Sequence, residues 1–542
     1  MLAASPWGRS VILRGMRFFN TVGPVKPEKH YLIPPLDRVD TEGLLELIQQ
    51  EKYFVLHAPR QTGKTSALLA LRDLLHGGGA GDFRCLYASI QPAQAVHGDL
   101  ERAMPLVLGA LAEQARDTLG DDSVEALAQD ALKSVGAGGA LRRVLGRWSQ
   151  NDSRPLVLLL DEVDALTGDA LVSLLGQLRA GYHDRPERFP QSVVLCGLRD
   201  IRDYRLDLGG AAFADSGVSP FNIVARSVRL GDFTEAETRA LLAQHTTETG
   251  QVFGADALQV VWEQTRGQPW LVNALADETC FRSESGRDRS RAIAAEDIFT
   301  ARDRIVQRRE VHLDQLAFRL RDPRVRRVIE PILSGGDGDE ITDDDLAYVR
   351  DLGLVAVDDP IRIANPIYGE VVPRVVASRA QRAMREQTAW YVRPDGDLDM
   401  GKLLQAFQEW FRENSEHWVE RFGSYEAGPQ LLLHSFLHRV VNGGGWIHRE
   451  QPLGAGRADL LILWPRPEGG SARRFVVECK LARRSLERTM EEGLHQTAAY
   501  MDRAAAESGH LVIFDLTDKT WDEKILRRNQ ETGGKPITIW GM

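Results

Sequence analysis

Short apolar runs alternate with longer helical segments over residues 16–231. Four of these runs have the length and the β-branched or aromatic content of strands: Tyr53–His57, Arg84–Ser89, Leu156–Leu160 and Val193–Cys196. Strands that alternate with helical segments form βαβ units, in which the strands lie parallel and the helices cover the sheet. The sequence therefore predicts an α/β fold with a parallel sheet in this part of the chain.

The segment VLHAPRQTGKTSALLALRDLL places a glycine-containing loop between a strand and a helix. The backbone N–H groups of such a P-loop, with the positive end of the helix, bind phosphate. Gly63 lets the backbone pass under the phosphate, Lys64 reaches its oxygens, and the Thr65 hydroxyl ligates Mg²⁺. Ala58 stands where the usual pattern has its first glycine. The predicted nucleotide-binding residues of this loop are Ala58, Pro59, Arg60, Gln61, Thr62, Gly63, Lys64, Thr65 and Ser66.

The segment RPLVLLLDEVDAL ends five aliphatic residues with two acids, Asp161 and Glu162. In a P-loop ATPase, the first acid holds Mg²⁺ and the second orients or deprotonates the attacking water. Acids at the positive end of a helix are the alternative, and this explains Asp164 but not acids directly after a buried strand. We therefore predict ATP and Mg²⁺ as cofactors. The arginine that would neutralise the transition state is left open among Arg199, Arg202 and Arg226.

Segments rich in glycine, proline or charged residues mark the boundaries of further parts of the chain. Residues 1–15 form an N-terminal extension, and Met16 is an alternative start. Residues 232–305 read as a helical lid whose first helix, in TEAETRALLAQHT, is capped by Thr234. Residues 306–380 combine two helices with the strand-like PIRIANPIY, which favours a winged helix. A linker at 381–401 leads to a second α/β domain at 402–542, with strands at Ala458–Leu463, Phe475–Glu478, His510–Phe514 and Ile537–Trp540.

The order of motifs over residues 16–380 resembles the AAA+-related signal-transduction ATPases, in particular their archaeal-type prokaryotic branch. The motifs are the P-loop, the D-E pair, CGLRDIRDY, SPFNI and G-Q-P. The resemblance implies that Gly267 and Pro269 lie beside the adenine and that Arg38, in PPLDR, helps to hold the nucleotide. The chain departs from plain AAA+ proteins at 197–199, where Gly-Leu-Arg replaces the usual Asn or Thr sensor.

The segment RFVVECKLARR closes an apolar strand on two opposite charges, Glu478 and Lys480. Upstream, Asp459 begins the apolar strand of GAGRADLLILW, which predicts two carboxylates and one ammonium at one sheet edge. Two such carboxylates repel each other, whereas Mg²⁺ accepts oxygen ligands. We expect Asp459, Glu478 and the Cys479 carbonyl to ligate Mg²⁺, with Lys480 positioning or activating a water. A solvated charge cluster with Arg457 is the alternative.

This second pattern resembles the PD-(D/E)XK nuclease fold over residues 402–542, with Ala458 in the nominal proline position. GLHQTAAYMD supplies Gln496 and Tyr500, which match the Q-x-x-x-Y element of several such nucleases. The preceding segment YEAGPQLLLHSFLHRVV carries Glu426, the candidate for an additional metal-site acid, with Gln430 as the runner-up. The resemblance implies Mg²⁺-dependent hydrolysis of a phosphodiester in a fold of restriction-endonuclease type.

Several other patterns have two interpretations. Arg483, Arg484 and Arg488 follow the charged strand and are favoured as a phosphate-facing patch over an ordinary charged face. His434 and His438 have ligand-like spacing, but without accompanying ligands they are interpreted as a helix face. An aromatic series at near-helical spacing is expected to be core, not a base-stacking surface: Phe407, Trp410, Phe411, Trp418 and Phe422.

Composition limits the function classes that remain. A net charge of −10 means that nucleic acid would have to be held by a local basic surface. No apolar run approaches the ~18 residues of a membrane span, and the four cysteines lack C-x-x-C spacing, so we expect a cytoplasmic protein. The favoured function is an ATP-controlled, Mg²⁺-dependent nuclease acting on DNA or RNA, in defence against foreign nucleic acid.

The main alternative is a non-enzymatic ATP-driven switch whose C-terminal domain grips nucleic acid or a protein partner. A third interpretation, DNA loading or motor activity, requires a ring of copies of the chain, and a homo-oligomer is left open. An intact set of Asp459, Glu478 and Lys480 favours the nuclease.

Overall fold

The chain divides into two compact units. The first comprises Met1–Leu316 with Thr342–Gly369, and the second Ala317–Ile341 with Glu370–Met542. The boundary between the units therefore crosses the segment 306–380. The computed structural model describes residues 17–76, 82–96, 98–198, 223–308, 316, 318–333, 341–372, 390–422, 433, 436–437, 446–453, 456–466, 472–482, 485–515, 517 and 519–542.

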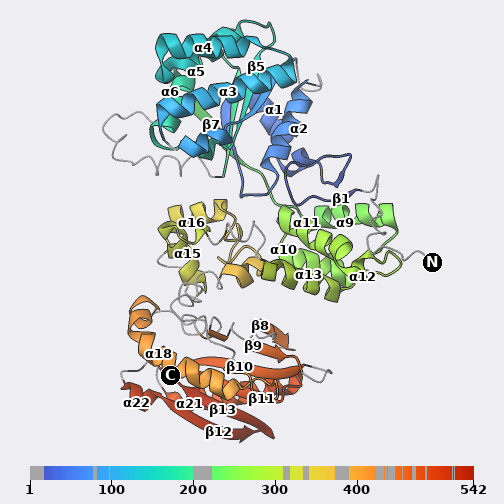
Figure 1. The fold of residues 1–542 in the computed structure, drawn as a ribbon, viewed down its shortest axis with the longest axis vertical. Coiled ribbons are helices and arrows are strands. Elements are labelled where there is room, and N and C mark those ends of the chain that lie inside the picture. The colour runs from blue at the N-terminus through green and yellow to red at the C-terminus, as the bar shows by residue number, and fades with distance from the viewer. Residues whose placement is uncertain are drawn as a thin grey trace, which may run out of the picture. The chain divides into compact units, whose positions relative to one another are not determined.

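The first unit contains a five-stranded sheet in which every neighbouring pair is parallel, in the order β4-β5-β6-β3-β7 (Figure 1). Its strands are β3 Tyr53–His57, β4 Arg84–Ser89, β5 Leu156–Asp161, β6 Ser192–Gly197 and β7 Val224–Arg229. All residues of β3, β5 and β6 are buried, because helices cover both faces, and this explains their continuous apolar sequences. The predicted α/β fold with a parallel sheet is confirmed.

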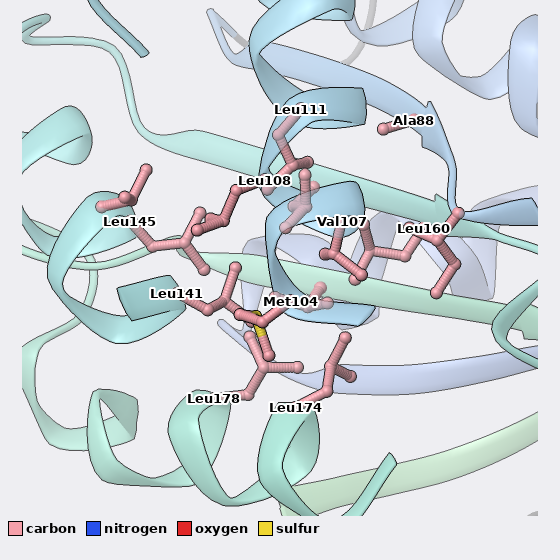
Figure 2. Close-up of a cluster of buried hydrophobic side chains, with 14 of the residues drawn as sticks. Ala88, Met104, Val107, Leu108, Leu111, Leu141, Leu145, Leu160, Leu174 and Leu178 are labelled. Atoms are coloured by element: carbon pink, nitrogen blue, oxygen red, sulfur yellow. The ribbon is translucent and has the colours of Figure 1, made fainter. Parts of the chain in front are cut away.

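One face of this sheet is covered by α3 Leu100–Leu119, α5 Ala137–Ser149 and α6 Gly168–Ala180. Figure 2 shows Leu108 and Leu111 of α3, Leu141 and Leu145 of α5, and Leu174 and Leu178 of α6 gathered in one cluster with Leu160 of β5. With α4 Ser123–Val135, helices α3 and α5 form an insertion between β4 and β5, and α4 contributes Val124, Ala128 and Ala131 to the same core. A second core of this unit contains Ile48 of α1 Thr41–Gln49, and Leu68 and Leu71 of α2 Lys64–His76.

The segment predicted as a helical lid contains helices, and its predicted cap at Thr234 is present. Thr234 caps α9 Glu235–Thr249 through a capping box, in which its Oγ1 accepts from the Glu237 N–H at 3.2 Å and Glu237 Oε2 accepts from the Thr234 N–H at 2.7 Å. The following elements are α10 Ala255–Thr265, α11 Pro269–Asp277, the π-helical turn Glu278–Arg282, α12 Glu284–Arg287 and α13 Ala295–Arg308.

A strap at the N-terminal side, residues 17–38, was not predicted from the sequence. It contains β1 Phe18–Phe19, paired in parallel with β2 His30–Tyr31, and the 3₁₀ turn η1 Pro35–Arg38. The strap is attached to α9, because Arg17 Nε lies 2.9 Å from Glu248 Oε2 and Tyr31 Oη lies 3.3 Å from His245 Nδ1. The strands are only two residues long, which leaves no periodicity to read.

Gly267, after α10, is expected to be intolerant of any side chain. Its φ is +78°, and an added Cβ would lie 1.9 Å from the Phe233 carbonyl oxygen. Gly250, after α9, has the same φ of +78° with nothing within 4 Å of that position. Gly250→Ala should therefore cost about 1–2 kcal/mol for the left-handed backbone alone, and Gly267→Ala a further ~1–3 kcal/mol for the overlap. Denaturant titration of the two variants measures the difference, and equal losses would contradict the predicted overlap.

The second unit contains a mixed six-stranded sheet in the order β12-β13-β11-β10-β9-β8 (Figure 1). Strands β8, β9 and β10 are antiparallel, β10, β11 and β13 are parallel, and β12 is antiparallel to β13. The strands are β8 Trp446–Leu453, β9 Gly456–Trp464, β10 Arg473–Ala482, β11 Ser508–Asp515, β12 Leu526–Thr532 and β13 Lys535–Gly541. Four of them correspond to predicted strands, while β8 and β12 were not predicted.

Two helices contribute to different cores of this second sheet. Helix α21 Leu486–Arg503 connects β10 to β11 and shares a core with Val476 and Leu511. Helix α18 Met400–Phe422 contributes Leu404 and Phe407 to a core with Val477 and Val512. Phe407 and Phe411 are buried, which confirms the interpretation of these two aromatic residues as core. The short α22 Trp521–Lys524 precedes β12.

The segment predicted as a winged helix has the two expected helices, α15 Pro323–Leu333 and α16 Asp343–Asp351. In place of the strand-like PIRIANPIY the structure has an isolated bridge between Val355 and Ile363. Helix α15 belongs to the second unit and α16 to the first.

Candidate nucleotide and metal sites

The loop between β3 and α2 has the backbone shape of a phosphate cradle. Gln61 and Gly63 both have positive φ, +57° and +94°. A Cβ on Gly63 would lie 3.2 Å from Arg38 Nη1, so the position favours glycine for both backbone shape and space. Lys64 is buried at the start of α2, and its Nζ donates to the carbonyl oxygens of Ala58 at 3.0 Å and Pro59 at 2.9 Å. The lysine ammonium therefore lies over the loop, where phosphate oxygens would compete with the two carbonyls.

Asp161, at the end of β5, joins the loop to the sheet. Thr65 Oγ1 donates to Asp161 Oδ2 at 2.7 Å, and the Glu162 N–H donates to Oδ1 at 2.9 Å. Tyr87 on the neighbouring strand β4 also donates its hydroxyl to Asp161 Oδ2, at 3.1 Å. The carboxylate is 1% exposed, so these contacts determine its orientation. Tyr87 was missed by the sequence analysis, because only the β4-β5 pairing reveals that it reaches Asp161.

Glu162 follows with a left-handed backbone, φ +58°. Burial raises the pKa of Glu162, and Asp161 and Asp164 add to the rise, while Lys64 opposes it. A carboxylate with a raised pKa is a stronger base, which suits a group that accepts a proton from water.

Arg38 lies against the loop from the strap side. Its guanidinium donates to the Thr62 carbonyl at 2.6 Å and to the Gly231 carbonyl, and it stacks 4.9 Å from the ring centroid of Phe233. Burial lowers the pKa of Arg38 to about 10. The side chain therefore links the P-loop to the entrance of the lid, and the structure brings this predicted nucleotide-binding residue into the site.

A hollow of about 130 Å³ lies between the strap, the P-loop and the lid. Its lining includes Thr62 and Gly63 of the loop, Val25 of the strap, and Pro269 and Trp270 of α11. Hydrogen bonds hold the three parts together: Trp270 Nε1 donates to the Thr21 carbonyl at 3.0 Å, and the Val25 N–H donates to Ser66 Oγ at 3.0 Å. The hollow has the position and the mixed apolar and polar lining expected of a nucleoside pocket.

The glycine and the proline of the G-Q-P motif are placed differently relative to this hollow. Pro269 lines the hollow, whereas Gly267 is not among its lining residues. Gly267 instead accepts a hydrogen bond from the Phe233 N–H at 2.9 Å. Among the arginine candidates, Arg226 is exposed on β7, and Arg199 and Arg202 lie outside the described residues.

The oxygen atoms of Thr65 and Asp161 fit a magnesium ion. Both are hard donors, and their separation of 2.7 Å lies in the range of neighbouring ligands around a small cation. Thr65 supplies a hydroxyl and Asp161 a buried carboxylate, which is the donor chemistry that Mg²⁺ takes in phosphate sites.

The charged strand of the second unit is longer than the sequence suggested. The predicted strand ended at Glu478, whereas β10 continues to Ala482, because it pairs in parallel with β11 as far as Ala482 opposite Asp515. Glu478 and Lys480 therefore lie within the strand, on the same side of it, since side chains alternate. Lys480 Nζ donates to Glu478 Oε1 at 2.7 Å, with 27% of the lysine side chain and 3% of the glutamate side chain exposed.

The described pairing of β9 with β10 ends at Leu460 opposite Val477, and one further step along the antiparallel register brings position 459 opposite Glu478. The Asp459 side chain lies outside the described part of the chain. Cys479 is buried at 2% exposure between the two charged residues. Among the residues that the structure describes, no three His, Cys, Asp or Glu side chains gather as a metal site would require.

The two α21 residues predicted as a supporting set differ in burial. Tyr500 is 8% exposed and shares a core with Val476 and Ala482, which lie on the same side of β10 as Glu478 and Lys480 because side chains alternate along a strand. Gln496 is exposed one turn earlier. Arg488 is exposed and pairs with Glu492 at 3.0 Å. The predicted positions Glu426, Gln430, His434, His438, Arg483 and Arg484, and the side chains of Trp418 and Phe422, lie outside the described residues.

None of the helices in the described ranges is both long enough and apolar enough to cross a membrane. No protein-family model and no curated protein matches the chain. Solved structures similar to it include a Walker-type ATPase of Pyrococcus abyssi, which is 15% identical, covers 65% of this chain and 99% of its own, and has a TM-score of 0.43.

Two further solved structures show comparable similarity. RuvB of Thermotoga maritima, described as a Holliday junction branch migration motor, is 12% identical, with 63% of this chain and 98% of its own covered at a TM-score of 0.33. Cdc6p of Pyrobaculum aerophilum is 14% identical, with 65% and 97% covered at a TM-score of 0.34. The strand order and the loop geometry described above define the fold of the first unit.

Proposed function

We propose that the first unit binds and hydrolyses ATP with Mg²⁺, and that this cycle controls a Mg²⁺-dependent nuclease site in the second unit that acts on DNA or RNA. The observation that carries the ATPase half is the 2.7 Å contact between Thr65 Oγ1 and Asp161 Oδ2. It joins the helix after the glycine loop to the end of a buried strand, as a phosphate-bound magnesium requires. Defence against foreign nucleic acid suits this combination of activities.

The chain's own residues have separate roles in ATP hydrolysis. The loop N–H groups and the Lys64 ammonium bind phosphate oxygens, and Thr65 and Asp161 would hold the magnesium ion. The ion, when bound, neutralises charge on the phosphates. Glu162 accepts a proton from the attacking water, and its raised pKa strengthens it as a base. Arg38 and Pro269 support the nucleoside side of the site from the strap and the lid.

Control of the second unit is supported by contacts beneath the P-loop. His57, the last residue of β3, lies 3.7 Å from Asp351, and Arg229 donates to the Arg350 carbonyl at 3.3 Å. A Cβ on Gly353 would lie 2.6 Å from the Pro59 ring. The segment Thr342–Gly369 therefore packs against the strand and loop that would hold the phosphates. Both of its ends continue into the second unit, so the chain itself provides the route for the proposed control.

The nuclease half of the proposal is supported by the Glu478–Lys480 pair. The pair lies on a strand next to the position of Asp459, and the two acids with the Cys479 carbonyl would hold a magnesium ion. A bound ion would stabilise charge at a phosphodiester. Lys480 is the more exposed partner, so its ammonium can hold a water or a phosphate oxygen while Glu478 stays buried.

Other parts of the proposal rest on the sequence alone. These are a winged helix within 306–380 and a basic patch at Arg483, Arg484 and Arg488 as nucleic-acid contacts, Glu426, Gln496 and Tyr500 as supporting residues, a cytoplasmic location, and assembly into a homo-oligomer. The alternative is a non-enzymatic, ATP-driven switch. The 2.7 Å contact between Lys480 Nζ and Glu478 Oε1 favours this alternative, because a buried ion pair can have a purely structural role.

Incubation of the purified full chain with plasmid, linear and single-stranded substrates tests the proposal. We expect cleavage that requires Mg²⁺ and changes with ATP, because the two sites are proposed to be coupled. Gel analysis with and without ATP measures both effects. No cleavage under any nucleotide condition, or equal cleavage in excess EDTA, would favour the non-enzymatic switch.

A further inference from the structure

A second hollow, of about 410 Å³, lies on the three-helix insertion between β4 and β5. Four arginines line it: Arg142, Arg143 and Arg147 of α5, and Arg188 from the segment that follows α6. Asp184 is the acid among the lining residues, and Asp130 of α4 contacts two of the arginines. Four positive and two negative charges leave about two positive charges here, although the chain as a whole carries −10.

Helix α5 presents two different faces. Its apolar face, with Leu141 and Leu145, lies in the core over the sheet (Figure 2). The lining positions 139, 142, 143, 146, 147 and 150 repeat at helical spacing, so they share the other face. The arginines are therefore carried by a helix that is anchored by its core side, and their positions relative to one another are fixed by the helix.

The arginine side chains are accessible. Arg147 is paired with Asp130 at 2.7 Å and Arg188 with Asp184 at 3.1 Å, yet 48% and 68% of these side chains stay exposed. Within the described part of the chain, no group accepts a hydrogen bond or ion pair from the exposed Arg142 guanidinium. Surface ion pairs contribute little to stability, so an anion that binds arginine more strongly can replace these carboxylates.

Gly146 leaves space at the floor of the hollow. It lies on the lining face of α5, and a Cβ there would have only the Arg188 carbonyl within reach, at 3.6 Å, whereas a Cβ on Gly139 would lie 3.2 Å from Val135 Cγ2. A bulky anionic group can therefore approach the helix backbone between the arginines. Apart from these, the lining offers only Val135 and the buried Phe189 as apolar contacts. An acidic protein partner would need larger apolar anchors than these.

We infer that this arginine hollow binds the sugar-phosphate backbone of nucleic acid. Arginine forks match phosphate oxygens in pairs. Arg142 and Arg147 are five residues apart, about 7.5 Å along a helix, and two phosphates of one strand are separated by a similar distance. The site is distinct from the nucleic-acid contacts of the proposed function, and the inference shares with that proposal only the class of ligand. The hollow would position nucleic acid on the ATP-binding unit itself.

The test measures binding of short fluorescent single-stranded and duplex oligonucleotides to the full chain, in EDTA and without nucleotide, so that neither proposed reaction takes place. We expect Arg142→Gln with Arg147→Gln to lower affinity at least about tenfold at low salt. The slope of log affinity against log salt on duplex DNA should fall by about 0.9 for each phosphate that the variant no longer neutralises.

A matched control is Arg102→Gln with Arg116→Gln on α3 of the same insertion. It also removes two exposed arginines, one of which is paired with an acid, Arg116 with Glu125 at 3.7 Å. This control should bind like the wild type. Equal loss in both double variants, or binding without salt dependence, would overturn the inference. Because no hydrolysis is measured, that failure is distinguishable from failure of the proposed ATPase or nuclease.

A second variant tests space instead of charge. Gly146→Leu keeps every arginine and is compatible with the helix, but its side chain would fill the floor of the hollow. We expect lower affinity with an unchanged fold, verified by circular dichroism. Affinity equal to that of the wild type would exclude contact at this floor and contradict the inferred binding mode.

Discussion

Replacement of Glu162 by glutamine is expected to slow ATP hydrolysis by about 10²–10⁴-fold, because a positioned base contributes rate enhancements of that order. Nucleotide binding should stay near the wild-type level, since the phosphates are held by the loop and by Lys64. Phosphate-release kinetics and calorimetry measure the two effects separately. Lys64→Ala should have the opposite pattern, with ATP affinity lowered at least about tenfold by loss of a charge-assisted contact.

The pH dependence of hydrolysis provides an independent test of the same carboxylate. Burial raises the pKa of Glu162, so the base stays protonated to a higher pH than an ordinary glutamate. Because the active form is deprotonated, the rate should rise with pH through this raised pKa, and the acidic limb should be missing from the residual activity of Glu162→Gln.

Arg72→Ala is a control for Lys64→Ala. It removes a cation from the same helix, but one that pairs with its exposed neighbour Asp73 at 2.7 Å. It should leave ATP affinity unchanged. Equal ATP affinity in wild type and Lys64→Ala would contradict the phosphate-binding role of the loop, and full turnover in Glu162→Gln would contradict its role as the base.

Replacement of Lys480 by alanine is expected to abolish nucleic-acid cleavage while ATP hydrolysis continues. The proposed phosphodiester chemistry needs an ammonium beside Glu478, and the P-loop belongs to the other unit. Asp459→Ala should have the same effect by removing a predicted metal ligand. Substrate cleavage and phosphate release, measured on the same preparation, separate the two activities.

Loss of a lysine from a buried carboxylate also has a structural cost, and the second unit contains a matched pair for comparison. Lys519 lies 3.3 Å from Asp515, whose side chain is 1% exposed. Lys519→Ala should therefore resemble Lys480→Ala in thermal stability but keep cleavage. Loss of cleavage in both variants would indicate a stability effect, and cleavage that survives Lys480→Ala would remove this residue from the proposed mechanism.

The contrast between these two sites shows how much the sequence alone could predict. The P-loop could be predicted because the features that define it lie close together in the sequence. A strand, a glycine at positive φ and a helix beginning at Lys64 follow one another in the chain. The acids after β5 were equally readable, because five buried aliphatics that end directly in Asp161 and Glu162 form a pattern within one short segment. The Thr234 cap was predicted for the same reason, since its hydrogen bonds reach only three residues.

The charged strand could be predicted only in part. Its alternation and the positions of Glu478 and Lys480 are local properties of β10, but its end depends on β11, a neighbour reached only after α21. The sequence contained no signal for that pairing length. The parallel partner continues to Asp515 and therefore keeps β10 extended past the two charges.

Contacts between distant segments were decided by the tertiary structure. Tyr87 reaches Asp161 because β4 and β5 are neighbours, and the strap reaches α11 through Thr21 and Trp270, 249 residues apart. The sequence shows the arginines of α5, but it does not predict their shared hollow, because Arg188, from the segment after α6, also lines it. Local backbone geometry and burial pattern are encoded over a few residues and can be read from them. The pairing of strands and the packing of helices join residues whose separation along the chain leaves no periodic signal, and so only the folded chain determines them.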